Sequence, residues 1–163
     1  MASMEGLTWM HYEQTPVPKW VATTIGLGVP KMPGQTYQGE CSVNVGKIPG
    51  DDAAYFLSVG PFHGGYVSAY TKKGADPKST EWVHHFLDLF GTPEQKYLQG
   101  SGPGHFVASG DFDGDGVDEC LVGLMGPSAE GQGVYYYKPI DLPNGIFARW
   151  KVADESAARI AVG

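Results

Sequence analysis

Short runs in which hydrophobic and polar residues alternate cover most of the chain, and segments rich in glycine and proline separate them. Alternation is typical of β-strands, because successive side chains of a strand point to opposite faces of a sheet. The runs KWVATTIG (19–26), EWVHHFLD (81–88) and IFARWKVA (146–153) share this pattern. With 24 glycines and 12 prolines in 163 residues, long helices would be interrupted repeatedly. The pattern therefore predicts an all-β fold.

The strand-like runs recur in the same order with a period of about 60 residues. Each full repeat begins with a run that ends in glycine and continues with an apolar run, an aromatic run and an alternating run. Four short strands per repeat, joined by tight turns, are typical of the blades of a β-propeller. The runs that end in glycine are CSVNVG (41–46), FVASG (106–110) and RIAVG (159–163).

We therefore predict a partial β-propeller that forms a single domain over residues 1–163. Complete four-stranded blades are expected at 42–87 and 106–152. Residues 7–25 are expected to supply only the two outer strands of another blade, and residues 159–163 only the innermost strand of a further one. Small residues dominate the expected innermost strands, which suits the crowded centre where blades converge.

Carboxylates alternate with glycines in GDFDGDGVDE (110–119), as in loops that wrap a hard cation. A helical calcium hand would need a bidentate Glu at the twelfth loop position, but counting from Asp111 that position is Val122. We therefore expect a structural calcium or magnesium turn between two strands; the alternative is a solvated acidic turn without an ion. Crowded carboxylates repel one another unless something neutralises them, which favours the cation. The expected ligands are Asp111, Asp113, Asp115, the Val117 carbonyl and Glu119.

Charge and composition exclude several classes of function. The net charge is −7 and no Lys/Arg cluster occurs, so a nucleic-acid partner is not expected. No apolar run approaches the roughly 18 residues that span a bilayer, and the first residues lack the apolar core of a secretory signal. A cytoplasmic or otherwise intracellular location is expected, with Cys41 and Cys120 as buried thiols in a reduced compartment.

Several segments resemble known propellers. GDFDGDGVDECLVGLMG (110–126) resembles the FG-GAP type of metal-binding repeat found in integrin-like propellers. From about Trp20 onward, most of the chain resembles, in order and spacing, part of the propeller domain of fungal aldos-2-ulose dehydratases. The segments that carry this resemblance are GPFHGGYVSAYTK (60–72), EWVHHFLDLFG (81–91), HFVASGDFDGDGVDECLVGLMG (105–126) and SAARIAVG (156–163).

The resemblance implies a seven-bladed propeller that is followed by cupin and lectin-like domains. It also implies a zinc-dependent lyase, which removes water from 1,5-anhydrofructose or glucosone and has isomerisation as a second activity. Metal centres are implied in the propeller cleft and in the cupin. The chain departs from this pattern, because it contains two full blades and no cupin segment.

Two histidines are expected on one rim of the propeller. In a four-stranded blade, the second-to-third connection and the link to the next blade emerge on the same face. His63 lies in the former and His105 in the latter, opposite the acidic loop and near the central funnel where propellers place ligands. They are candidate zinc ligands, and either one, if not ligating, is a candidate base for dehydration of a keto-sugar. The alternative is that both cap turns or pack, and no third histidine is expected on this rim.

The remaining candidates favour structural roles. Three histidines belong to predicted outer strands and are interpreted as surface or packing residues: His11, His84 and His85. Residues 135–137, three consecutive tyrosines, are interpreted first as a packed strand and second as a sugar-stacking platform. Tyr37 and Arg159 lie near blade links; either could contact a ligand, although a structural role is favoured.

Two hypotheses about function remain open. The first is a sugar-dehydratase-like segment that takes a keto-sugar; the second is a non-catalytic carbohydrate-binding or self-assembling propeller scaffold. A truncated piece without activity of its own is a third interpretation. Because an open propeller leaves blade faces and strand edges uncovered, we expect a homo-oligomer whose copies combine blades into a ring.

Overall fold

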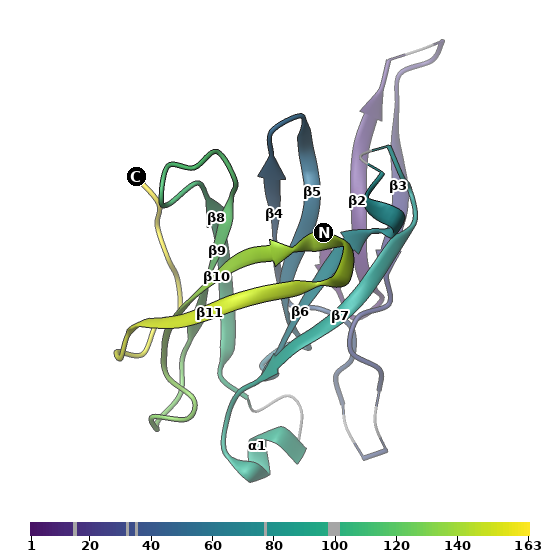
Figure 1. Ribbon diagram of the computed structural model, residues 1–163. Coiled ribbons are helices and arrows are strands. Elements are labelled where there is room, and N and C mark those ends of the chain that lie inside the picture. The colour runs from purple at the N-terminus through teal and green to yellow at the C-terminus, as the bar shows by residue number, and fades with distance from the viewer. Residues whose placement is uncertain (15, 32, 35, 77, 98–101) are drawn as a thin grey trace.

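The structure, a computed structural model, describes residues 1–163 except 15, 32, 35, 77 and 98–101. Its strands form three antiparallel sheets that stand side by side (Figure 1). The predicted all-β fold with four-stranded propeller blades is confirmed, and the three sheets do not close into a ring. Within the described residues, no helix is long and apolar enough to cross a membrane.

The N-terminal sheet has the order β1-β2-β3. Strands β2 (Gly6–Glu13) and β3 (Lys19–Gly26) form the hairpin that the alternation between residues 7 and 25 predicts. Strand β1 (Ala2–Ser3) is an addition, since two residues are too short to show a pattern. It pairs with the start of β2 through a turn in which Gly6 has a φ of 106°, a value that favours glycine.

The first complete sheet runs β4-β5-β6-β7 and the second runs β8-β9-β10-β11, each built from successive hairpins. Their tight turns explain why glycine and proline fall between the strand-like runs. The strands of the first sheet are β4 (Ser42–Ile48), β5 (Asp51–Gly60), β6 (Tyr66–Lys72) and β7 (Trp82–Leu89), and those of the second are β8 (Gly104–Gly110), β9 (Glu119–Leu124), β10 (Gly133–Asp141) and β11 (Ile146–Ala153).

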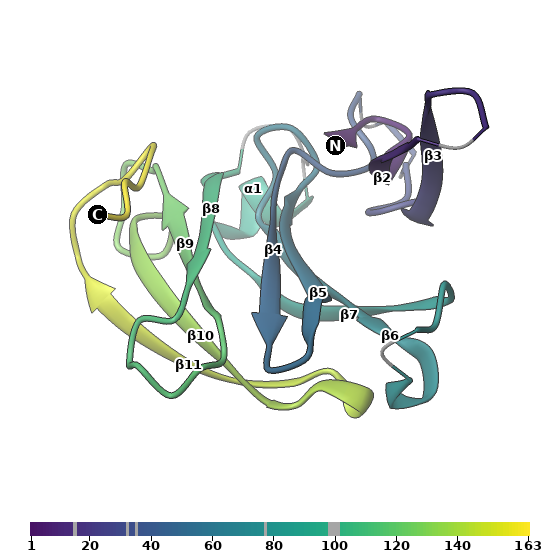
Figure 2. The ribbon, with the colours of Figure 1, turned by 90° about the horizontal axis from the view of Figure 1, so that it is seen from above.

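Strand β5 is buried on both faces, because a sheet packs on each side of it. Tyr55, Leu57 and Val59 lie in the core shared with the second complete sheet. Phe56 lies in the core shared with the N-terminal sheet, together with Tyr70 of β6. This explains why β5 reads as a nearly continuous apolar run rather than an alternating one. In Figure 2 the inner strands β4 and β8 of the complete sheets face each other.

Two features differ from the prediction. Residues 159–163 form no strand, so the expected innermost strand of a further blade is not formed; a strand needs a partner to complete its backbone hydrogen bonds. The link between the complete sheets contains a short helix, α1 (Pro93–Tyr97). Thr92 and Gln95 form a capping box at its start, with the Thr92 N–H donating to Gln95 Oε1 (2.9 Å) and the Gln95 N–H to Thr92 Oγ1 (3.3 Å).

Candidate functional site

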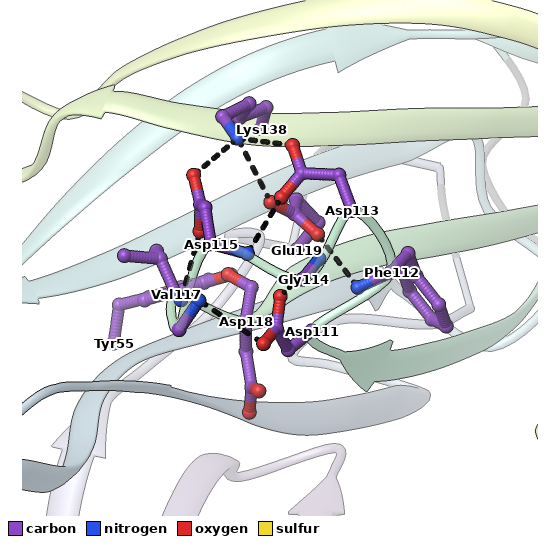
Figure 3. Close-up of polar contacts among 11 residues, drawn as sticks. Tyr55, Asp111, Phe112, Asp113, Gly114, Asp115, Val117, Asp118, Glu119 and Lys138 are labelled. Carbon is purple, nitrogen blue, oxygen red and sulfur yellow. Dashed lines mark hydrogen bonds and ion pairs between the residues drawn. The ribbon is translucent and has the colours of Figure 1, made fainter.

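The acidic loop joins β8 to β9, and its carboxylates hold its own backbone in a tight turn (Figure 3). Asp111 accepts hydrogen bonds from the backbone N–H groups of Gly114 (2.8 Å) and Gly116 (3.0 Å). Both glycines have positive φ, 79° and 89°, which other residues rarely adopt. Asp115 accepts a further bond from the Val117 N–H (2.9 Å). The sequence of alternating carboxylates and glycines is therefore the sequence that this turn requires.

The loop brings three carboxylates together at the surface. Asp111, Asp113 and Asp115 each place an oxygen within 4.8 Å of the others, and all three are exposed. Calcium binds oxygen at about 2.3–2.6 Å, so oxygens on one ion lie within about 5 Å of one another. The triad therefore fits a hard cation. Glu119 differs from the triad, because it is fully buried and accepts a hydrogen bond from the Phe112 N–H (2.9 Å).

Lys138 of β10 neutralises much of this charge. Its ammonium group pairs with Asp113, with Asp115 (2.7 Å) and with Glu119 (3.2 Å), as Figure 3 shows. Hydrogen bonds to Asp113 and Asp115 raise the pKa of Lys138, and the bond from Lys138 lowers the pKa of Asp115. The sequence reasoning missed this lysine. Lys138 could have been found from the register of the two strands: Tyr137 pairs with Cys120, which places Lys138 opposite Glu119.

Blade packing anchors the far side of the loop. The Tyr55 hydroxyl donates to the Asp118 carbonyl (2.6 Å), and the Lys47 N–H donates to the Asp118 carboxylate (3.1 Å). The corresponding turn of the first complete sheet is arranged differently. There Asp51 forms a nearly buried ion pair with Lys72 (2.5 Å).

His63 and His105 lie side by side at the other end of β8. Their ring centroids are 4.8 Å apart and their planes are nearly perpendicular, at 88°. His105 is the second residue of strand β8, and the acidic loop follows the last residue of that strand, so the two sites lie at opposite ends of β8. The structure brings the two predicted histidines together, and their role as zinc ligands or base stays a prediction. His63 has a φ of 52°, and its loop is tied to β8 by a bond from the Gly104 N–H to the Gly64 carbonyl (2.7 Å).

The histidine pair satisfies part of what zinc requires. Burial, and secondarily the charge of His63, lowers the pKa of His105, which favours the neutral imidazole that ligates metals. Its Nε2 is buried and has no hydrogen-bond partner among the residues that the structure describes. Among the described residues, neither His63 nor His105 belongs to a group of three side chains that could ligate a metal together. Zinc at His63 and His105 stays a prediction that needs a third ligand.

Of the two residues just before β4, the sequence reasoning missed Glu40, and it misjudged the burial of Cys41. Glu40 is only 2% exposed, and the Tyr70 hydroxyl donates to its Oε1 (2.6 Å). Burial raises the pKa of Glu40 to about 7, outweighing the opposite effects of Tyr70 and Ser58. Cys41 is half-buried rather than buried as expected, whereas Cys120 is buried. Burial raises the pKa of the Cys41 thiol, and a hydrogen bond from the His63 backbone opposes this rise.

The other histidines have the packing and surface positions expected of them. His84 stacks on Tyr70 with ring centroids 4.5 Å apart, and His85 Nε2 lies 2.9 Å from Thr71 Oγ1. His11 lies beside Glu13.

The three-tyrosine run of β10 packs as a strand. Its third member, Tyr137, is buried and donates to Asp88 (2.7 Å). The two residues placed near blade links differ in their surroundings: Tyr37 meets Phe62 edge-on, and Arg159 is exposed.

The sheets, their packing and the metal-fitting loop together define a segment of a β-propeller. Comparison with known proteins agrees: the family described as the β-propeller domain of aldos-2-ulose dehydratase matches residues 1–73. The aldos-2-ulose dehydratase of Phanerodontia chrysosporium is 38% identical to the chain over 167 aligned residues. The alignment covers 99% of this chain and 18% of that protein, so the chain spans about a fifth of its length. The chain is therefore a homologue of aldos-2-ulose dehydratase that corresponds to a segment of its propeller domain.

Proposed function

We propose that the chain is a propeller segment that takes part in the dehydration of an aldos-2-ulose or a related keto-sugar such as 1,5-anhydrofructose. The observation that carries this proposal is the convergence of His63 and His105 at one rim, with ring centroids 4.8 Å apart. The similarity to aldos-2-ulose dehydratase supports the choice of substrate class.

The chemistry requires a base near the sugar carbonyl. The base takes a proton from the carbon next to the carbonyl, and the electron pair left behind forms a carbon–carbon double bond. The hydroxyl group on the following carbon leaves and, with a proton, becomes water. His105, with its lowered pKa, is suited to accept the first proton near neutral pH. A zinc ion held by the pair would polarise the carbonyl and acidify that carbon.

Replacing either His63 or His105 with alanine is expected to slow the reaction by about 100-fold or more, the usual contribution of a general base. The measurement is the rise in ultraviolet absorbance of the conjugated enone formed from 1,5-anhydrofructose. His11→Ala is the matched control, because His11 lies on the N-terminal sheet, and it should leave the rate unchanged. Wild-type rates in both rim variants would contradict the mechanism.

We also propose that the acidic loop binds calcium or magnesium and stabilises the loop between β8 and β9. The approach of three exposed carboxylates to within 4.8 Å supports this role. Because Lys138 competes for the same oxygens, the cation is expected to displace its ammonium group.

Titration calorimetry with calcium and with magnesium tests the cation site. Asp113→Asn should weaken binding by about tenfold or more, since affinity follows the number of charged ligands. Asp52→Asn, at the start of β5 beside the corresponding turn of the first complete sheet, is the control and should bind as the wild type does. Lys138→Met should bind more tightly, because the competing ammonium is gone. Absence of binding of either ion to the wild-type chain would overturn the proposal.

The second candidate function is a non-catalytic, self-assembling scaffold. The N-terminal sheet and the second complete sheet, at the two ends of the row of three sheets, keep large apolar side chains exposed, which favours self-assembly. Their exposed fractions are 50% for Tyr12, 66% for Trp20, 52% for Trp150 and 56% for Val152. Cation binding without any enone formation by the wild-type chain would favour this function over the enzymatic one.

A further inference from the structure

A pocket of about 270 Å³ lies between the N-terminal segment and the link that precedes β4, and its wall includes Phe62, the residue before His63. This volume is close to the lower end of the range for small-molecule sites, about 300–1,000 Å³, so it suits one small ring. Its lining comes from three separate segments of the chain. The lining residues are Ala2, Ser3, Met4, Tyr37, Gln38, Glu40, Cys41 and Phe62.

A row of ring contacts connects this pocket to the histidines. Tyr37 meets Phe62 at 5.4 Å between centroids, and Phe62 meets His63 at 4.2 Å. His63 in turn meets His105 at 4.8 Å. The thiol of Cys41, which also lines the pocket, receives a hydrogen bond from the His63 backbone. A molecule seated in the pocket would therefore lie beside the loop that carries His63.

The lining favours a neutral ligand that bears hydroxyl groups. It contains two aromatic rings and a few polar groups but no lysine, arginine or histidine. Aromatic walls with a small number of polar groups are typical of sites for small organic molecules. Glu40 adds an incomplete polar partner: it is 2% exposed, and its Oε2 has no hydrogen-bond partner in the described part of the chain. A sugar hydroxyl can both donate to and accept from such a group.

We propose that this pocket, with Tyr37 and Phe62 as its aromatic wall, is the subsite that holds the sugar ring beside His63. The inference rests on the proposed function for the identity of the ligand, but it concerns binding and not the chemical step. It predicts that a sugar analogue that cannot be dehydrated still enters the pocket.

Cys41 provides a built-in reporter for this site. Cys120 is completely buried, whereas Cys41 is half-exposed and lines the pocket, so alkylation of the native protein should modify Cys41. The probe is 1,5-anhydroglucitol, which has the ring and hydroxyls but no carbonyl, and the reagent is uncharged iodoacetamide. At ten times the dissociation constant, the alkylation rate should fall about tenfold by mass action. Glycerol at the same concentration controls for bulk effects.

Variants of the pocket wall test whether the sugar analogue binds in this pocket. Phe62→Ala and Tyr37→Ala should each lose the protection, while Phe86→Ala, which removes an exposed ring of β7, should keep it. Equal alkylation rates with and without the sugar, or protection that survives in both wall variants, would overturn the subsite. His63→Ala should keep protection and lose enone formation. If the sugar protects Cys41 in the wild-type protein but no enone is formed, the proposed chemistry is wrong and the proposed subsite is retained.

Discussion

In the wild-type protein, Glu40 is expected to lower the free energy of unfolding by on the order of 3 kcal/mol as pH rises from about 4.5 to 7. Replacing Glu40 with glutamine should abolish this decrease. The carboxyl group is 2% exposed, and burial raises its pKa from 4.5 to about 7. A shift of one pKa unit corresponds to about 1.4 kcal/mol, which gives this magnitude.

The sign follows from which state holds the proton. Between pH 4.5 and 7 the unfolded chain has released the proton of Glu40, while the folded protein retains it. Proton binding therefore favours the folded state at low pH, and the free energy of unfolding falls as pH rises through this window. Above pH 7 the folded protein carries a buried carboxylate, which the Tyr70 hydroxyl stabilises only in part. Glutamine has a similar shape and no charge to bury.

Urea unfolding at several pH values measures this effect as the difference between wild type and Glu40→Gln, so that other titrating groups cancel. The exposed Glu5→Gln is the matched control and should follow the wild-type curve. Tyr70→Phe removes a bond that lowers the pKa of Glu40, so its loss of stability should continue to higher pH. Parallel curves for wild type and Glu40→Gln would show that Glu40 titrates normally.

The repeat of strand-like runs was sufficient to predict the two complete sheets, because blade hairpins are local in sequence and their turns require glycine. The acidic turn could be predicted for the same reason: Gly114 and Gly116 supply the positive φ values that bring the carboxylates together. The proximity of His63 and His105 followed from connectivity alone, since both segments emerge at the same end of adjacent blades.

What the sequence did not reveal depends on contacts between distant segments. Lys138 reaches the acidic loop only because of the register between β9 and β10. No pattern in the sequence marks Glu40, because its raised pKa arises from burial in the folded protein. Residues 159–163 have strand-like alternation, but they pair with no strand of the described chain.

Replacing Tyr55 should be among the most destabilising single changes in the protein. The side chain is completely buried in the core between the complete sheets, and its hydroxyl donates to the Asp118 carbonyl (2.6 Å). Its ring meets Phe147 of β11 edge-on, with centroids 5.4 Å apart. Tyr55→Ala should cost about 3–5 kcal/mol, as for other large aromatic residues in cores. Tyr55→Phe keeps the ring but leaves the Asp118 carbonyl without its hydrogen bond, so it should lower the free energy of unfolding by about 1–3 kcal/mol.

Gly46 explains how the Tyr55 ring fits and provides a sharper test than truncation alone. The two residues pair across β4 and β5, and a Cβ added at Gly46 would lie 2.1 Å from atoms of the Tyr55 ring. Gly46→Ala should therefore destabilise the wild-type protein by about 1–3 kcal/mol or more, yet cost much less in Tyr55→Leu, where the ring is gone. A double-mutant cycle by urea unfolding should give a coupling energy of about 1–3 kcal/mol. If the two changes instead add, the ring does not lie over Gly46 and the register between β4 and β5 is wrong.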